Sequence, residues 1–216
     1  MIREADYPFG RGKYQIKEGV GKKKALNKRQ LKAIANYSDG NKFTEFYRDL
    51  WLFIYFCNGI NVADLINLKF SDIQNGEISF IREKTKDRTR DTKRIYAPIT
   101  PEMQSIIEKW GNNPRKSIYI FPFMKAGDDA WEHEKKKKNL TKHINDRMKV
   151  IGEKLNIGKI TTYVARHTYA TVLRNEGVPV SIISPMLGHT SITTTEIYLA
   201  DLESENRARN ASLLSF

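Results

Sequence analysis

The sequence has little cysteine and no long apolar run. Its 216 residues include one cysteine, Cys57, which excludes a disulfide framework and any zinc site built from cysteines. No stretch reaches the roughly 18 uncharged apolar residues of a transmembrane span. The first ten residues, MIREADYPFG, lack the apolar region of a secretory signal. These absences predict a folded protein of the cytoplasm.

Composition and charge point to a folded, basic protein. Hydrophobic residues make up 40% of the chain, enough to bury a core, and the length fits one large domain or one domain plus an arm. Lysine and arginine number 37 against 25 acidic residues, for a net charge of +12. This excess favours a polyanionic partner such as nucleic acid, although a highly charged solvated surface gives the same count.

The two ends of the chain differ from its middle. Residues 1–25 are polar and contain four glycines and the run Lys22-Lys23-Lys24. We interpret them as a basic arm or linker whose cations lie against phosphates; the alternative is a disordered end. Regular structure begins near Leu26, so the predicted domain covers residues 26–216, with a tail at 202–216 that starts polar and ends apolar.

Helical spacing dominates the first half of the predicted domain. Asn27 followed by Gln30 predicts a capping box at a helix start. A second helix is predicted over 43–57, with Phe43 among the residues on its apolar face, and Gly59 is expected to close it. A short helix over 62–68 follows.

The period then changes to that of strands. Residues 77–82 and 93–98 alternate as two strands, and the charged segment 83–92 between them is predicted to be a hairpin loop in solvent. Thr100-Pro101 opens a further helix, because proline suits the first helical position. Later helices are predicted from after 135–138 to near 155, and as short pieces from 162 onward. The predicted fold is mainly α with a small antiparallel β-sheet.

Three segments carry the most informative residues. Taken singly, Arg166, His189 and Tyr198 have ordinary explanations as an ion-pair member, a helix cap and a half-buried tyrosine. Together, residues 166–171 (RHTYAT) and 187–189 (LGH), with Tyr198 nine positions after His189, resemble the second and third boxes of the tyrosine recombinase (phage integrase) family. Residues 58–68 resemble its first box, and Lys84 resembles its hairpin lysine.

The resemblance implies a DNA breaking-rejoining reaction that needs no metal and no cofactor. In this family a tyrosine, here Tyr198, attacks a phosphodiester to give a 3′-phosphotyrosyl link and a free 5′-hydroxyl. The link keeps the energy of the broken bond, so rejoining needs no nucleotide. Arginine suits the phosphate because its planar fork donates two parallel hydrogen bonds and stays charged. That role falls to Arg166.

The remaining roles also follow from the resemblance. Lys84 is expected to be the general acid, with Lys86 as the alternative two residues along. His189 is expected to hydrogen-bond a non-bridging oxygen, His167 to fill the supporting base position, and Asp64 to orient the site. The expected DNA contacts come from these cations: Lys22, Lys23, Lys24, Lys86 and Arg88.

Two positions depart from the family pattern. Asn61 stands where the first box has arginine, and loss of a charged phosphate donor costs several kcal/mol, on the order of the loss of an oxyanion-hole donor. We hypothesise that Arg82 or Arg94, on the strands, supplies the missing charge. Tyr163 stands where the family has histidine or lysine; a phenol still donates a hydrogen bond but is not the same base.

The length and tail raise further expectations. Family members usually carry an N-terminal core-binding domain of about a hundred residues, and the catalytic-type sequence here starts near Leu26, so we favour a fragment of a longer protein. In this family tails such as 202–216 dock on a neighbouring protomer; folding back on its own core is the alternative.

Four functions compete at this point. The leading hypothesis is a site-specific recombinase or integrase of a mobile element, acting at the bacterial nucleoid on a double-stranded attachment site. The others are a non-catalytic DNA-binding protein on the same scaffold, a type IB topoisomerase-like enzyme, and a basic RNA-binding or ribosome-associated protein. The spacing of Arg166, His189 and Tyr198 argues against the last, because binding by shape needs no such triad.

Overall fold

A computed structural model of the chain describes residues 24–84, 93–189, 193, 195 and 196. The expectations for Lys22, Lys23, Lys86, Arg88, Tyr198 and the tail 202–216 therefore lie outside the described residues. The elements in chain order are α1 (Lys28–Ala35), α2 (Lys42–Phe56), α3 (Val62–Leu65), the 3₁₀ turn η2 (Phe70–Asp72), β1 (Ile73–Gln74), β2 (Glu77–Ile81), β3 (Arg94–Pro98), α4 (Pro101–Trp110), α5 (Ala130–Lys154), α6 (Thr162–Asn175) and α7 (Val180–Met186). The predicted fold class, mainly α with a small antiparallel sheet, is confirmed.

Local sequence signals place two of the helix starts. Asn27 caps α1, and the reciprocal bonds between Asn27 and Gln30 form the predicted capping box. Thr100 caps α4 by accepting from the N–H of Met103, with Pro101 at the first helical position. Both caps satisfy N–H groups that have no partner within the helix.

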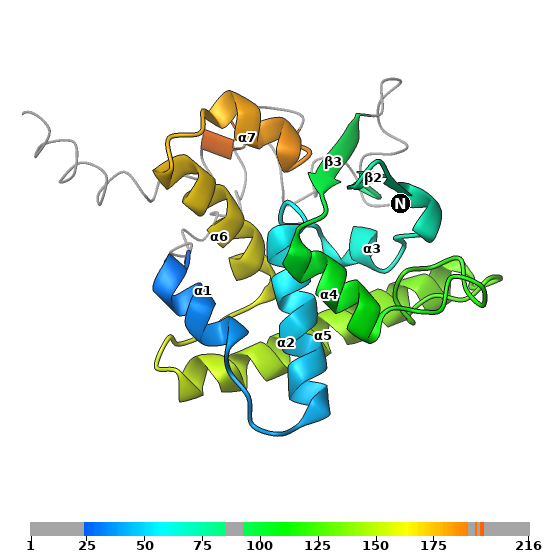
Figure 1. Cartoon of the computed structure of the whole chain (residues 1–216), viewed down its shortest axis with the longest axis horizontal. Coiled ribbons are helices and arrows are strands. Elements are labelled where there is room, and N and C mark those ends of the chain that lie inside the picture. The colour runs from blue at the N-terminus through cyan, green and yellow to red at the C-terminus, as the bar shows by residue number, and fades with distance from the viewer. Residues whose placement is uncertain (1–23, 85–92, 190–192, 194, 197–216) are drawn as a thin grey trace, which may run out of the picture.

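Helix α2 forms the centre of the molecule, and α1, α4, α5 and α6 pack around it (Figure 1). Leu50, Trp51, Phe53 and Ile54 are fully buried, so the core surrounds the second half of α2 instead of lying along one stripe. The prediction that Phe43 belongs to the apolar face is wrong, because its side chain is 67% exposed at the start of the helix.

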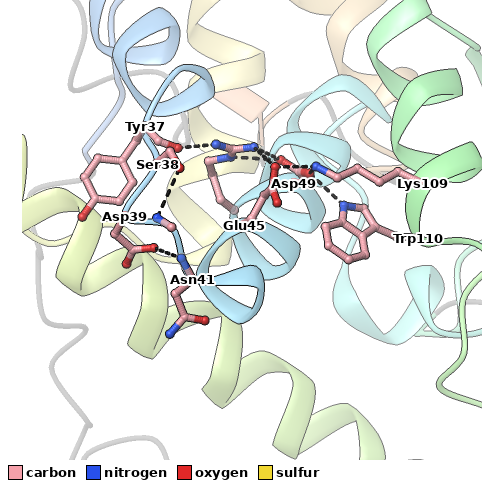
Figure 2. A network of polar contacts seen from close by, with 10 residues as sticks. Tyr37, Ser38, Asp39, Asn41, Glu45, Asp49, Lys109 and Trp110 are labelled. Carbon is pink, nitrogen blue, oxygen red and sulfur yellow. Dashed lines mark hydrogen bonds and ion pairs between the residues drawn. The ribbon is translucent and has the colours of Figure 1, made fainter.

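A polar network joins α2 to α4 and to the segment between α1 and α2 (Figure 2). The buried carboxylate of Asp49 accepts from Arg48, from Lys109 at 3.2 Å and from the indole N–H of Trp110 at 2.7 Å. Arg48 also donates to the carbonyl of Tyr37. A carboxylate at this depth is tolerated because several donors replace its water.

The sheet has three antiparallel strands in the order β1-β2-β3. Phe80 of β2 pairs with Ile95 of β3, and Ile81 pairs with Arg94. The two-residue strand β1 was not predicted, because it is too short to show alternation. The basic stretch 135–138 lies inside α5 instead of before it, since the helix already begins at the cap of Asp129 on Glu132.

The described residues contain neither a membrane-spanning helix nor a cluster of metal-binding side chains. No helix among them is both long and apolar enough to cross a membrane. Within the same residues, histidine, cysteine, aspartate and glutamate do not gather in groups of three or more that would hold a metal ion.

Candidate active site

Arg166 is the centre of the site. It lies in the first half of α6 with 6% of its surface exposed. Its Nη1 donates to the carbonyl of Gly59 at 2.8 Å, and its Nη2 donates to the carbonyl of Leu187 and to Nε2 of His189 at 3.1 Å. One guanidinium therefore holds together the first-box turn, α6 and the end of α7.

Gly59 lets the backbone approach Arg166 closely. It has a φ of +61°, a conformation that glycine adopts at little cost. A Cβ at this position would lie 2.8 Å from Cα of Arg166, closer than side-chain carbons normally come to backbone. The first-box glycine is thus required both by its own backbone and by the arginine beside it.

His189 follows the turn after α7, and its ring lies between Arg166 and Thr195. Because a guanidinium only donates, Nε2 accepts from Arg166, which assigns the proton of the neutral ring to Nδ1. Nδ1 lies 2.8 Å from the hydroxyl oxygen of Thr195, to which it donates. Burial and the positive charges of Arg166, Arg82 and Lys84 lower the pKa of His189 to about 4. The ring is therefore neutral at physiological pH.

A second arginine reaches the same turn from the sheet. Arg82, the residue after β2, donates from Nη1 to the carbonyl of Gly188 at 2.7 Å. Gly188 has a φ of +64°, and a Cβ there would lie 2.4 Å from both Cδ of Arg82 and Cδ1 of Ile95. The glycine before His189 is needed so that β2 and β3 can lie directly against the turn.

Asp64 is buried, interacts with the charges of Arg82 and Arg166, and holds the end of the sheet in place. Its Oδ1 accepts from the backbone N–H of Glu83 at 2.7 Å, and the Asn61 side chain also donates to it. Burial raises the pKa of Asp64, opposed by the Glu83 N–H and by the charge of Arg82. The carboxylate fixes the backbone between Arg82 and Lys84, consistent with an orienting role.

Lys84 and Arg94 occupy different surroundings. Lys84 is exposed, and its charge acts on His189, which places it at the edge of the site. Arg94 donates from Nη1 to the hydroxyl and the carbonyl of Ser79 and lines a cavity of about 390 Å³ with Tyr119 and other residues. Of the two strand arginines hypothesised to replace the first-box arginine, the structure places Arg82 against the Arg166–His189 pair.

The histidine and tyrosine near Arg166 have contrasting exposure. His167 is completely buried, and its ring stacks on that of Tyr163 with centroids 6.4 Å apart. Tyr163 itself is 52% exposed. In this conformation a DNA phosphate can touch the phenol of Tyr163 but not the imidazole of His167.

Lys24 is the one arm lysine among the described residues. Its Nζ donates to the carbonyl of Ile157, and to that of Lys159 at 3.3 Å. Partial burial lowers the pKa of Lys24. This lysine fixes the start of the domain to the segment after α5, a contact that the expectation of phosphate binding did not include.

Sequence reasoning missed the acceptor groups of the site. Thr195 was not singled out, although it lies within the same informative segment, three residues before Tyr198. The carbonyls of Gly59, Leu187 and Gly188 carry no residue-type signal of their own, since every residue has a carbonyl. Only their place inside two of the boxes pointed to them.

Comparison with curated proteins gives a consistent set of relatives. The tyrosine recombinase XerA of Pyrococcus furiosus is 28% identical over 177 residues, which cover 81% of this chain and 56% of the relative. The tyrosine recombinase XerC of Chlamydia caviae is 26% identical over 172 residues, 78% of this chain and 52% of the relative. The chain thus spans about half the length of these relatives.

Solved structures show the same fold at lower identity. XerH recombinase in a post-cleavage complex with its palindromic difH substrate superposes with a TM-score of 0.63 at 17% identity, over 90% of this chain and 54% of that one. The Tn1549 transposon integrase in complex with a circular intermediate DNA gives a TM-score of 0.55 at 18% identity, over 89% and 68%.

The family comparison covers most of the chain and includes each of the segments discussed above. Residues 24–205 match the phage integrase family, a range that contains the first box, the hairpin lysine position, Arg166, His189 and Tyr198. The chain belongs to the phage integrase family of tyrosine recombinases.

Proposed function

We propose that this chain is the catalytic domain of a site-specific DNA recombinase that cuts and rejoins double-stranded DNA through Tyr198. The observation that carries the proposal is the contact of Arg166 with His189, with Arg82 and Lys84 close enough to act on the same ring. Three cations around one neutral histidine form a site for a phosphate. The sequence then brings Tyr198 two residues after the last described position.

Arg166 stabilises the charge that develops on the phosphate. The transition state of phosphoryl transfer spreads negative charge over the non-bridging oxygens, so catalysis consists mainly of positioning and electrostatic stabilisation. A guanidinium already held by Gly59 and Leu187 needs no reorganisation when the substrate arrives. The phosphate oxygens replace His189 Nε2 as acceptors from Nη2.

Proton transfer completes the reaction. A tyrosine hydroxyl has a pKa of about 10, so roughly one in a thousand is ionised at pH 7. Tyr198 loses its proton to water as its oxygen bonds to phosphorus and the bond from phosphorus to the 5′-oxygen breaks, and Lys84 gives a proton to that leaving oxygen. The negative phosphate favours a proton on His189 Nε2, which then donates to a non-bridging oxygen.

The remaining groups act on the DNA and on assembly. In this proposal, residues 1–25 form the basic arm and residues 26–216 the catalytic domain. The cations that contact the DNA backbone are Lys22, Lys23, Lys86 and Arg88, whereas Lys24 holds the start of the domain through the carbonyls of Ile157 and Lys159. The tail 202–216 docks on a neighbouring protomer, and the partner is the recombination site of a mobile element in the cytoplasm. His167 supports Arg166 from within α6.

The test is covalent capture of the protein on DNA. Nicked duplexes, tiled across the DNA on both sides of the gene that encodes the chain, are incubated at low ionic strength, because binding weakens steeply with salt. A nick beside the cleaved bond lets the short 5′-hydroxyl strand diffuse away, so the adduct accumulates. We expect an adduct that survives denaturation with the wild type and none with Tyr198→Phe.

A second function is favoured by one observation. The Asn61 side chain donates to Asp64 and brings no charge to the phosphate. A DNA-binding protein without cleavage activity would tolerate this loss of charge. Under that alternative, wild type and Tyr198→Phe bind duplexes equally and neither forms an adduct. A type IB topoisomerase activity would instead form adducts and relax plasmid DNA without a preferred site.

A further inference from the structure

Two guanidinium groups bind neighbouring carbonyls of one turn. Arg166 donates to the carbonyl of Leu187, and Arg82 donates to the carbonyl of Gly188 at 2.7 Å. Both charges act on His189, the next residue along. The two cations therefore approach the same turn from α6 and from the end of β2.

We propose that Arg82 supplies the second positive charge at the scissile phosphate, in place of the charge that Asn61 lacks. The inference rests on the proposed function and names a further residue of the same site. In this arrangement the cation comes from the sheet instead of from the first-box helix. Asn61 keeps only an orienting contact with the Asp64 carboxylate.

The surroundings of Arg82 favour an electrostatic role. The side chain is half-buried, and burial lowers its pKa while the Asp64 carboxylate raises it. An arginine keeps its charge under such conditions, because its unperturbed pKa is above about 12. Exclusion of water lowers the local dielectric, so the charge acts more strongly on a phosphate than an exposed lysine does.

The stem of Arg82 is held in place before any substrate binds. Its Cδ packs against Gly188 so closely that a Cβ there would lie 2.4 Å away, and Ile95 closes the same contact. The Glu83 N–H, one residue on, is fixed by Asp64. Because packing and the fixed backbone already hold this guanidinium in place, little free energy is needed to orient its charge at the moment of reaction.

Arg94 does not share these features. It pairs with Ile81 across the sheet, so it lies on the face opposite to that of the neighbouring position 82 in an extended strand. Its guanidinium donates to Ser79 on its own face, and the residue is exposed. Arg94→Gln therefore serves as a matched control that removes an arginine from the same sheet.

The test separates charge from hydrogen bonding at position 82. Arg82→Gln keeps an N–H donor for the Gly188 carbonyl without the charge, and Arg82→Lys keeps both. Adduct formation is timed on the nicked duplex that the wild type cleaves. We expect Arg82→Gln to be slower by about 10²–10³-fold, Arg82→Lys by roughly tenfold, and Arg94→Gln to stay within about twofold of the wild type. Thermal unfolding checks that each variant is folded.

A second substrate makes the result specific to charge. In a methylphosphonate a methyl group replaces one non-bridging oxygen, so the phosphate loses its negative charge and needs less positive charge from the protein. We expect the defect of Arg82→Gln to shrink to less than about tenfold on this substrate. A purely structural role for Arg82 predicts the same defect on both substrates.

The outcomes distinguish this inference from the proposed function. If the wild type forms the adduct and Arg82→Gln forms it at the same rate, Arg82 does not supply the charge and the proposed function stands. The same conclusion follows if Arg82→Gln and Arg82→Lys are slowed by the same factor on both substrates. If the wild type forms no adduct on any tiled duplex, the proposed function fails and this inference fails with it.

Discussion

Arg166 and His189 share a hydrogen bond of 3.1 Å that joins α6 to the turn after α7. The bond fixes the tautomer of the histidine and holds the arginine beside it, so both groups are in place before a phosphate arrives. Because the same guanidinium also binds Gly59, the site closes only when three distant segments of the chain have packed. We therefore expect changes at these contacts to alter both folding and cleavage.

The pKa of His189 predicts how stability depends on pH. Unfolding returns the ring from about 4 to its usual value of 6.5, so the unfolded state binds more protons between these values. The free energy of unfolding should therefore fall as pH drops from 6.5 to 4, by about 1–2 kcal/mol after allowance for solvent screening of a half-buried ring.

Urea titrations at a series of pH values measure this dependence. His189→Asn has no such proton to bind, so its profile should lack this component of the slope. An identical slope in wild type and variant would show that His189 is not the group responsible.

The close approach at Gly59 predicts a paired effect on stability and cleavage. Gly59→Ala strains a residue with φ +61° and pushes a carbon against Arg166, so we expect a loss of about 2–4 kcal/mol in the free energy of unfolding. Cleavage should fall by about 10²-fold, because displacement of a catalytic group by about 1 Å has that effect.

Gly40 offers a matched control for the strain alone. It has a φ of +75°, and nothing lies within 4 Å of an added Cβ. Gly40→Ala should lose about 1–2 kcal/mol and keep its cleavage rate. Equal cleavage rates for the two alanine variants would contradict the role assigned to Gly59.

The assignment of Lys84 as general acid predicts a leaving-group effect. Lys84→Ala should slow cleavage of an ordinary phosphodiester by about 10²–10⁴-fold, the usual contribution of a general acid. When sulfur replaces the leaving 5′-oxygen, the departing group is a thiolate. Because a thiol has a pKa of about 8.5, this group leaves without needing a proton. The variant should then cleave within about tenfold of the wild type.

The cleavage rate of Lys86→Ala is measured on the same two substrates for comparison. If sulfur restores Lys86→Ala and leaves Lys84→Ala slow, the general acid is Lys86 and the assignment is wrong.

The network around Asp49 predicts a large effect on stability without an effect on chemistry (Figure 2). Asp49→Ala leaves Arg48 and Trp110 without their buried acceptor, so the free energy of unfolding should fall by about 3–5 kcal/mol. Glu45→Gln changes a partly exposed partner of Lys109 and should cost less than about 1 kcal/mol. Chemical denaturation of the three proteins measures both values; similar losses would contradict the central role of Asp49.

Local signals in the sequence were enough for much of the fold. The capping box of Asn27 and Gln30 and the cap of Thr100 depend on residues three positions apart, so the sequence shows them directly. The start of α5 carries the same kind of signal, Asp129 followed by Glu132, whereas the prediction placed the start after the lysines beyond it. Strand β1 is two residues long and shows no pattern by itself.

The site was predictable by residue type and not by geometry. The boxes identified Arg166 and His189, but the choice between Arg82 and Arg94 needed the sheet, because Arg82 reaches a carbonyl 106 residues away. The burial of His167 likewise depends on how α6 packs. Such contacts between distant segments carry no local signal, so only the structure reveals them.

Identification of the tyrosine that bonds to DNA is the decisive measurement for the proposed role of Tyr198. The trapped adduct is digested with nuclease and trypsin, and mass spectrometry locates the remaining nucleotide among the 10 tyrosines of the chain. We expect a nucleotide joined through its 3′-phosphate to Tyr198, with a free 5′-hydroxyl on the released strand. A nucleotide on any other tyrosine, or a link through a 5′-phosphate, would contradict it.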